Sequence, residues 1–180
     1  DWCSHNPRVI RHKITKTPCA FNQQPTTLSG LISGEDRMSL EERRMWGEMR
    51  MNPRDILDVN GSTYTYLVNG HGPQENWTGL FRSGEKVRLR FINGSAMTYF
   101  DVRIPGLKMT VVAADGQYVH PVTVDEFRIA TAETFDVIVE PTGQDAFTIF
   151  AQDSGRTGYI SGTLAVRQGL RAPVPNVDPK

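Results

Sequence analysis

The middle of the chain alternates between apolar and polar residues with a period of two. Val87, Leu89 and Phe91 are separated by charged residues, and the same spacing recurs at 100–104 and 135–139. Because successive side chains of a strand point to opposite faces, this pattern predicts strands with one buried face. Further apolar runs of strand length lie at 63–68, 109–114, 127–129, 146–150 and 162–166.

Short turn signals separate these runs. Each is a pair ending in glycine, and such pairs favour tight connections between strands. They occur at 60–61, 69–70, 83–84, 93–94, 105–106, 115–116 and 142–143. Seven or more short strands joined in this way are typical of an antiparallel β-sandwich or barrel. We therefore predict an all-β domain over residues 58–168, since no alternation of helices with strands supports a parallel sheet.

A single helix is predicted before this domain, over residues 39–51. Ser39 is a favourable N-cap, and Glu42 three residues later completes a capping box. The following residues are strong helix formers. Pro53 disfavours helical geometry at the residue before it and marks the end of the helix. Residues 37–57 are therefore expected to hold this short helix and a connector.

The two ends of the chain show no strand or helix period. Residues 1–36 are basic at first and then rich in polar residues and glycine, and are expected to form an irregular arm or linker. Residues 169–180 contain repeated prolines and are expected to form an extended linker that leaves the domain.

Charge and hydropathy narrow the classes of partner. Twenty Lys and Arg residues balance 20 Asp and Glu residues in the 180-residue chain, so the formal net charge is zero. Neutrality argues against a nucleic acid or an anionic membrane surface as partner, because both attract a basic face. No run approaches 18 apolar residues, so no membrane span is predicted. The chain begins at Asp1 without a signal peptide, and we expect that it is processed or cut from a longer protein.

The two cysteines leave alternatives open. Cys3 and Cys19 lie 16 residues apart and are suited to one disulfide loop in an oxidising compartment. The alternative is two unrelated thiols. A zinc site that includes His5 and His12 is a third interpretation, but the spacings match no established ligand pattern.

Signatures of catalysis are scarce in the predicted β-domain. The sequence has no nucleophile elbow, no phosphate-binding loop and no His-Glu-x-x-His motif. A blue-copper site requires a cysteine and two histidines, and residues 58–166 contain no cysteine. His71 and His120 are isolated and are interpreted as structural or surface residues. Asp115 precedes Gly116 and is interpreted as a turn residue.

Methionines gather in and beside the predicted helix. Met45 and Met49 are four residues apart and share one helix face, and Met51 follows them. Thioethers are soft ligands that suit Cu(I), so these three residues are candidate metal ligands. Thioethers also fill gaps in cores and interfaces, and packing at a contact between domains is the competing interpretation.

An ordered series of motifs resembles one known family. Residues 45–51 read Met-Trp-Gly-Glu-Met-Arg-Met and residues 87–93 read Val-Arg-Leu-Arg-Phe-Ile-Asn. Ala-Asp-Gly follows at 114–116 and Glu-Thr-Phe-Asp-Val at 133–137. Over roughly residues 37–175 the series resembles the middle domain of the bacterial copper-resistance multicopper oxidases, which are periplasmic laccase-like proteins. The last three motifs occur across multicopper oxidases. The first, with Gly-Leu-Phe-Arg at 79–82, narrows the resemblance to the copper-resistance branch.

The resemblance implies a cupredoxin-like β-sandwich, one of three in such an oxidase. These enzymes oxidise a substrate, such as Cu(I) or a phenol, at a blue copper and pass electrons to a trinuclear copper cluster that reduces dioxygen. The family's copper ligands lie in His-x-His and His-Cys-His motifs of the first and third domains. No position of this chain matches them, so no ligand is carried over. The middle domain spaces the outer domains and walls part of the substrate approach.

The resemblance therefore predicts a periplasmic fragment whose partners are the first and third domains of a parent copper enzyme. We expect this chain alone to be inactive, and we expect exposed apolar surface where the outer domains dock. Two alternatives remain: a stand-alone Cu(I)-binding module based on methionines, and a purely structural β-sandwich. Residues 1–35 depart from the family's usual approach to its middle domain.

Overall fold

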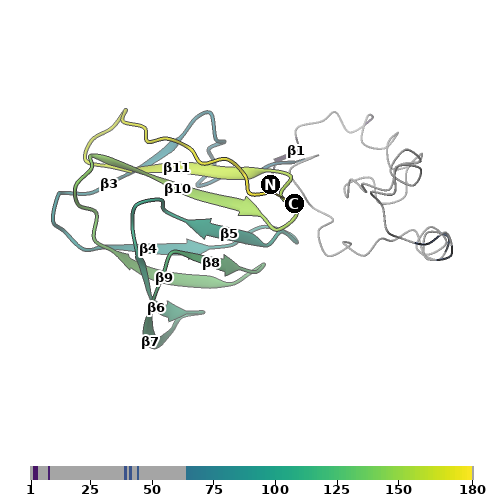
Figure 1. The fold of residues 1–180 in the computed structure, drawn as a ribbon, viewed down its shortest axis with the longest axis horizontal. Coiled ribbons are helices and arrows are strands. Elements are labelled where there is room, and N and C mark those ends of the chain that lie inside the picture. Colours follow the sequence, from purple (N-terminus) through teal and green to yellow (C-terminus); the bar gives the residue numbers. More distant parts are fainter. Residues whose placement is uncertain are drawn as a thin grey trace.

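Two facing β-sheets form most of the computed structural model, which describes residues 2–3, 8, 39, 41, 44 and 64–179 (Figure 1). One sheet has five strands in the order β3-β11-β10-β5-β8, and the other has four in the order β4-β9-β6-β7. The strands β1 and β2 pair separately. This arrangement confirms the predicted all-β sandwich.

The described strands are short, and most lie within the runs expected from the sequence. Their bounds are β1 Trp2–Cys3, β2 Tyr64–Thr65, β3 Trp77–Leu80, β4 Val87–Ile92, β5 Phe100–Arg103, β6 Met109–Ala114, β7 Gln117–Val124, β8 Glu126–Ile129, β9 Thr134–Val139, β10 Ala146–Asp153 and β11 Tyr159–Ala165. The predicted helix at 39–51 lies, for its greater part, outside the described residues. So do the predicted arm and connector.

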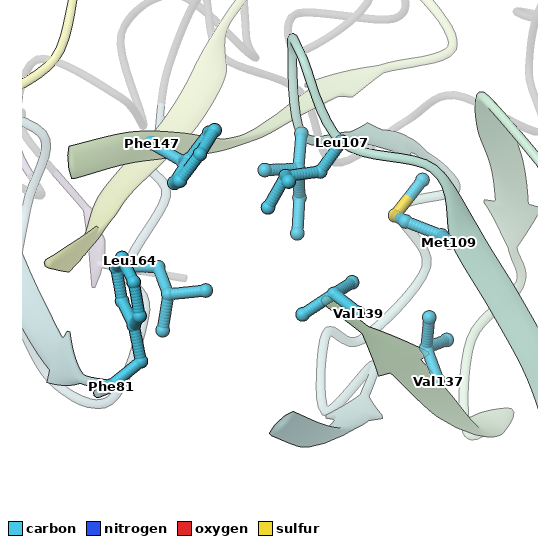
Figure 2. Packing of buried hydrophobic residues seen from close by; sticks show 8 residues of the cluster. Phe81, Leu107, Met109, Val137, Val139, Phe147 and Leu164 are labelled. Atoms are coloured by element: carbon cyan, nitrogen blue, oxygen red, sulfur yellow. The ribbon is translucent and has the colours of Figure 1, made fainter. Parts of the chain in front are cut away.

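The core lies between the two sheets and uses the predicted period. Val137 and Val139 of β9 are almost completely buried, and Val87, Leu89 and Phe91 of β4 pack against the same cluster. Figure 2 shows side chains from both layers converging in this cluster. Its buried members are Phe81, Ile104, Leu107, Met109, Val137, Val139, Phe147 and Leu164. The alternation in the sequence therefore marks the inward face of each strand.

Three strands were not expected from the sequence: β1, which lies in the arm predicted to be irregular, β3 and β7. Strand β3 pairs in parallel with β11, whereas the other pairs between named strands are antiparallel in the described residues. Strand β7 forms one edge of the four-stranded sheet, and seven of its eight residues are exposed. Because neither face of β7 is buried, its sequence carries no alternation, and Pro121 within it suits an edge strand.

The tight turn at 115–116 behaves as predicted. Asp115 and Gly116 both have positive φ, at 46° and 77°, and connect β6 to β7. A two-residue hairpin loop of this kind matches the right-handed twist of the strands. The Asp115 carboxylate also accepts a hydrogen bond from the backbone N–H of Thr134, at 2.8 Å. Asp115 is therefore a structural turn residue, as expected.

The C-terminal segment 170–179, here called the strap, lies across the outer face of the five-stranded sheet (Figure 1). The Thr148 hydroxyl donates a hydrogen bond to the Pro173 carbonyl at 3.0 Å, and the Asp178 N–H donates to the Gln152 side chain at 2.9 Å. Both anchoring residues lie on β10 and are buried. The strap thus covers an outward surface that would otherwise expose apolar and amide groups to water.

Candidate functional site

The described residues do not fit a copper centre. His71 closes a turn, where its ring Nδ1 lies 2.9 Å from the Asn69 carbonyl oxygen, and His120 is exposed on β7. Copper sites need several nitrogen and sulfur ligands that converge on one point. Among the described residues, no group of three or more His, Cys, Asp or Glu side chains meets that need.

Three methionines are the metal ligands predicted from the sequence. Met45, Met49 and Met51 lie outside the described residues, as does Cys19. Of the methionines that are described, Met109 is completely buried in the core and Met97 is partly exposed before β5. Neither has a described histidine or cysteine cluster beside it. The Cu(I) hypothesis therefore rests on the sequence alone.

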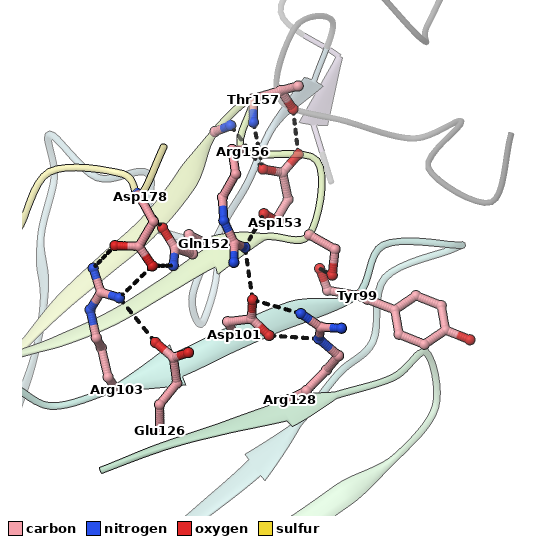
Figure 3. Close-up of polar contacts among 12 residues, drawn as sticks. Tyr99, Asp101, Arg103, Glu126, Arg128, Gln152, Asp153, Arg156, Thr157 and Asp178 are labelled. Atoms are coloured by element: carbon pink, nitrogen blue, oxygen red, sulfur yellow. Dashed lines mark hydrogen bonds and ion pairs between the residues drawn. The ribbon is translucent and has the colours of Figure 1, made fainter. Parts of the chain in front are cut away.

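A buried carboxylate between two arginines lies on the outer face of the five-stranded sheet (Figure 3). Asp101 alternates with core residues of β5 and is 3% exposed. Arg128 of the neighbouring β8 contacts it through two hydrogen bonds of 2.7 and 3.0 Å, and Arg156 approaches to 2.7 Å. Burial by itself would raise the pKa of Asp101, but the two guanidinium groups outweigh burial and hold it below its ordinary value.

A second carboxylate organises the turn between β10 and β11. Asp153 is almost completely buried and accepts hydrogen bonds from the N–H groups of Thr157 and Gly158 and from the Thr157 hydroxyl. The Tyr66 hydroxyl also donates to it, at 3.1 Å. Burial, followed by the nearby Asp153 charge, raises the pKa of Tyr66 above its ordinary value. Tyr66 therefore stays a neutral hydrogen-bond donor. Together these hydrogen bonds hold the turn between β10 and β11 in place.

A third charged group fastens the strap. Arg103 contacts Asp178 with hydrogen bonds of 2.9 and 3.0 Å, and it also contacts Glu126 at 3.0 Å. The Gln152 amide donates to the same Asp178 carboxylate. These hydrogen bonds, first that from Arg103, lower the pKa of Asp178 to about 2. The hydrogen bonds of this group join the strap to β5, β8 and β10, so its geometry is that of an anchor for the strap.

An open groove of about 560 Å³ lies between the two sheets. The inward side chains of the five-stranded sheet contribute Val102, Ile149, Ala151 and Ile160 to its lining. Every residue of β4 from Arg88 to Ile92 also contributes, and further lining comes from residues 67–69 and Trp77. The lining of the groove mixes apolar residues with Arg88, Arg90 and Asn93, and none of its described residues is an Asp, Glu or His that would support acid–base chemistry.

Apolar side chains are exposed along β7. Tyr118 is 81% exposed and Val122 is 55% exposed, while Val119 is somewhat less so. Arg88 of β4 lies over the Tyr118 ring at 5.8 Å. Exposed apolar side chains that cluster on one edge strand are typical of a contact surface. Tyr118, Val119 and Val122 are therefore candidate positions for the apolar contact surface expected from the sequence.

Sequence reasoning missed the charged groups on the outer face. Asp101 and Arg103 were recognised only as the polar half of an alternation, and Arg128 and Asp178 received no role. The available signal was that β5 and β8 each carry charged residues at alternate positions. The local sequence does not specify which strands become neighbours. It also does not specify that the strap returns over the sheet.

The chain matches the family model for multicopper oxidases over residues 32–169. It is 61% identical to the copper resistance protein A of Escherichia coli and 58% identical to that of Pseudomonas syringae pv. tomato, in both cases over the whole chain. It spans 30% of the length of each of these relatives.

Solved structures agree with this assignment. A laccase from Botrytis aclada is 26% identical, with a TM-score of 0.50, and the match covers 62% of this chain and 22% of that one. The fold is therefore the cupredoxin-like sandwich of such oxidases. No described helix of this chain is long and apolar enough to cross a membrane.

Proposed function

The chain belongs to the multicopper oxidase family, and from this premise we propose that it is the middle domain of a periplasmic copper-resistance oxidase. In this role it contributes no copper ligand, spaces the first and third domains and forms part of the substrate approach. The observation that carries the proposal is the 61% identity to a copper resistance protein A over the whole chain, which spans 30% of that relative.

The distribution of side chains supports a structural role for this domain. Its buried carboxylates have partners within the domain, as at Asp101 and Asp153. The described histidines are apart from any group of three metal-binding side chains. Copper supplies electron transfer and dioxygen reduction in such an enzyme, and on this proposal its ligands belong to the outer domains.

The edge strand β7 is the proposed contact for an outer domain. Tyr118, Val119 and Val122 present apolar surface there, and interfaces between domains of one chain bury such surface. The outer domains of the parent are the natural partner, because most of the length of the relatives lies outside this chain.

Copper addition tests the absence of ligands. The isolated chain is expected to show no blue colour and no oxidase turnover when Cu(II) is added, because its β-domain cannot supply a cysteine–histidine site. In the parent enzyme, replacing His71 and His120 by Ala is expected to leave the copper content per molecule unchanged. An intense visible thiolate-to-copper band in the isolated chain, or copper loss in the parent variant, would contradict the proposal.

A Cu(I) site at Met45, Met49 and Met51 is the second candidate, favoured by the spacing of these residues and by the copper-resistance relatives. Thioether ligands are soft and suit Cu(I). The Met45→Leu/Met49→Leu variant is therefore expected to lose Cu(I) to a competing chelator more readily than the wild type. Met97→Leu is the matched control. Equal Cu(I) affinity in all three proteins would show that Met45 and Met49 do not bind Cu(I).

A further inference from the structure

We propose that the exposed turn at Asn69 and Gly70 is a site of spontaneous deamidation, in which His71 assists the reaction by holding the carbonyl oxygen of Asn69. The modification converts the side-chain amide of Asn69 into a carboxylate, consumes water and releases ammonia. It needs no enzyme, metal or other cofactor. The inference goes beyond the proposed function and does not depend on copper.

The chemistry of an asparagine that precedes glycine defines what the site requires. The Gly70 backbone nitrogen loses its proton to hydroxide and attacks Cγ of Asn69. A bond forms between this nitrogen and Cγ, the bond from Cγ to Nδ2 breaks, and ammonia leaves with a proton taken from water. Water then opens the five-membered succinimide at either of its carbonyl groups, which yields aspartate or isoaspartate. The site therefore needs an accessible side chain, an unhindered backbone nitrogen and a turn that can open.

Both residues of the turn are accessible. Asn69 and Gly70 are exposed, and their φ angles are positive, at 48° and 82°. A side-chain carbon placed on Gly70 would meet no atom within 4 Å beyond its chain neighbours, so the space beside this residue is open. Glycine also lacks the side chain that would hinder attack by its own backbone nitrogen. The first two requirements are therefore met at this turn.

An isolated bridge between Val68 and His71 closes the turn. It consists of two backbone hydrogen bonds of 3.0 and 2.9 Å and lies outside the named strands. Closure of the succinimide ring requires Asn69 to leave its left-handed backbone conformation. Segments with few backbone hydrogen bonds and exposed side chains open at a small free energy. The turn can therefore reach the reactive geometry while both sheets of the sandwich stay folded.

His71 makes a contact that favours the reaction. Its ring Nδ1 lies 2.9 Å from the Asn69 carbonyl oxygen, and because a carbonyl oxygen only accepts hydrogen bonds, Nδ1 carries the proton. This carbonyl belongs to the same peptide group as the Gly70 nitrogen. When that nitrogen is deprotonated, resonance shares the negative charge with the carbonyl oxygen, and a donor directed at the oxygen stabilises the anion. His71 therefore favours the attacking form of the nitrogen.

Asn93, which also precedes a glycine, is the internal comparison. It is 6% exposed. Its Nδ2 donates hydrogen bonds to the carbonyl groups of Thr98 and Ile129, at 2.8 and 3.2 Å, and its Oδ1 accepts one from the Ser95 N–H at 3.1 Å. Attack at Asn93 requires these bonds to break and the side chain to leave the protein interior. The same dipeptide is therefore reactive at one position and protected at the other.

Peptide mapping of the parent oxidase tests the site. The folded protein is incubated at mildly alkaline pH, and mass spectrometry follows the conversion of amide to acid in the peptides that contain Asn69 and Asn93. We expect Asn69 to convert about tenfold faster than Asn93 or more, because a difference of about 1.4 kcal/mol in the free energy of opening gives this factor. In urea, where both turns are unfolded, the two rates are expected to become similar. Equal rates in the folded protein, or faster conversion of Asn93, overturn the proposal.

The sign of the effect of His71→Ala tests the role of the imidazole. This variant is expected to convert Asn69 about fivefold more slowly, the factor that corresponds to the loss of one neutral hydrogen bond. A histidine that only braced the turn would give the opposite sign, because its loss would let the turn open more often. His120→Ala on β7 is the matched control and is expected to leave the rate at Asn69 unchanged. An equal or faster rate at Asn69 in His71→Ala overturns the role proposed for His71.

Discussion

At the scale of single residues, two aspartates show how burial sets the contribution of an Asp–Arg ion pair to stability. Asp101 and Asp136 each lie on an internal strand beside two arginines. The Asp101 side chain is 5% exposed, whereas that of Asp136 is 20% exposed and its partner Arg90 is largely in water. Desolvated hydrogen bonds to charge contribute more than exposed pairs, which solvent screens.

We therefore expect Asp101→Asn to lower the free energy of unfolding by about 1.5–3 kcal/mol, the range for hydrogen bonds to charged groups. The matched variant Asp136→Asn is expected to cost less than about 1 kcal/mol, as for surface pairs. Urea denaturation of both variants and the wild type measures the difference. A loss for Asp136→Asn as large as that for Asp101→Asn would show that burial does not govern these pairs.

At the scale of elements, the strap is part of the sandwich and not merely an extension of it. It covers the outer face of β10, where Thr148, Phe150 and Gln152 are buried. Arg103 stacks over the Phe150 ring at 5.0 Å while it holds Asp178. One arginine thus joins an aromatic ring of the sheet to the end of the strap. Whether this segment also serves as a linker to a following domain stays a prediction.

The pH dependence of the strap follows from Asp178. Its pKa in the folded chain is about 2, below the ordinary value of 3.8, so its stabilising contribution is complete above about pH 4 and is lost as the pH falls toward 2. The difference in thermal midpoint between the wild type and Asp178→Asn is expected to shrink over this interval. Asp125→Asn, at an exposed pair with Lys108, is the control. A difference that stays constant from pH 5 to pH 2 would assign the effect of the substitution to packing.

At the scale of the whole molecule, the sandwich has two contrasting edges in the four-stranded sheet. The β7 edge displays apolar side chains to solvent, and the β4 edge borders the groove. Natural sheets protect their edges by charge, proline or a covering segment. Pro121 lies in β7, but Val119 and Val122 of the same strand remain exposed. This exposure is the reason for proposing that an outer domain covers β7.

Replacing Val122 by Ser is expected to lower the thermal midpoint of the parent oxidase by a few degrees, because an apolar contact between domains is lost. The isolated chain is expected to change little, since Val122 is already exposed there. Val174→Ser, at an exposed valine of the strap, is the matched control. Equal shifts of the thermal midpoint in the parent and in the isolated chain would show that Val122 of β7 does not contact another domain.

How far the sequence predicted the molecule depends on whether a feature is local or long-range. Alternation at Val87–Phe91 and 135–139 predicted strands and their buried faces, because side-chain direction in a strand depends only on neighbours along the chain. The Asp-Gly pair predicted its turn for the same reason, and the ordered motifs indicated the family.

Only the tertiary structure decided the rest. It paired Asp101 with Arg128 from another strand, returned the strap to Arg103, joined β3 to β11 in parallel and left the edge of β4 beside an open groove. These contacts join residues far apart in the chain. They depend on which strands become neighbours, and no local pattern of apolar and polar residues specifies that choice.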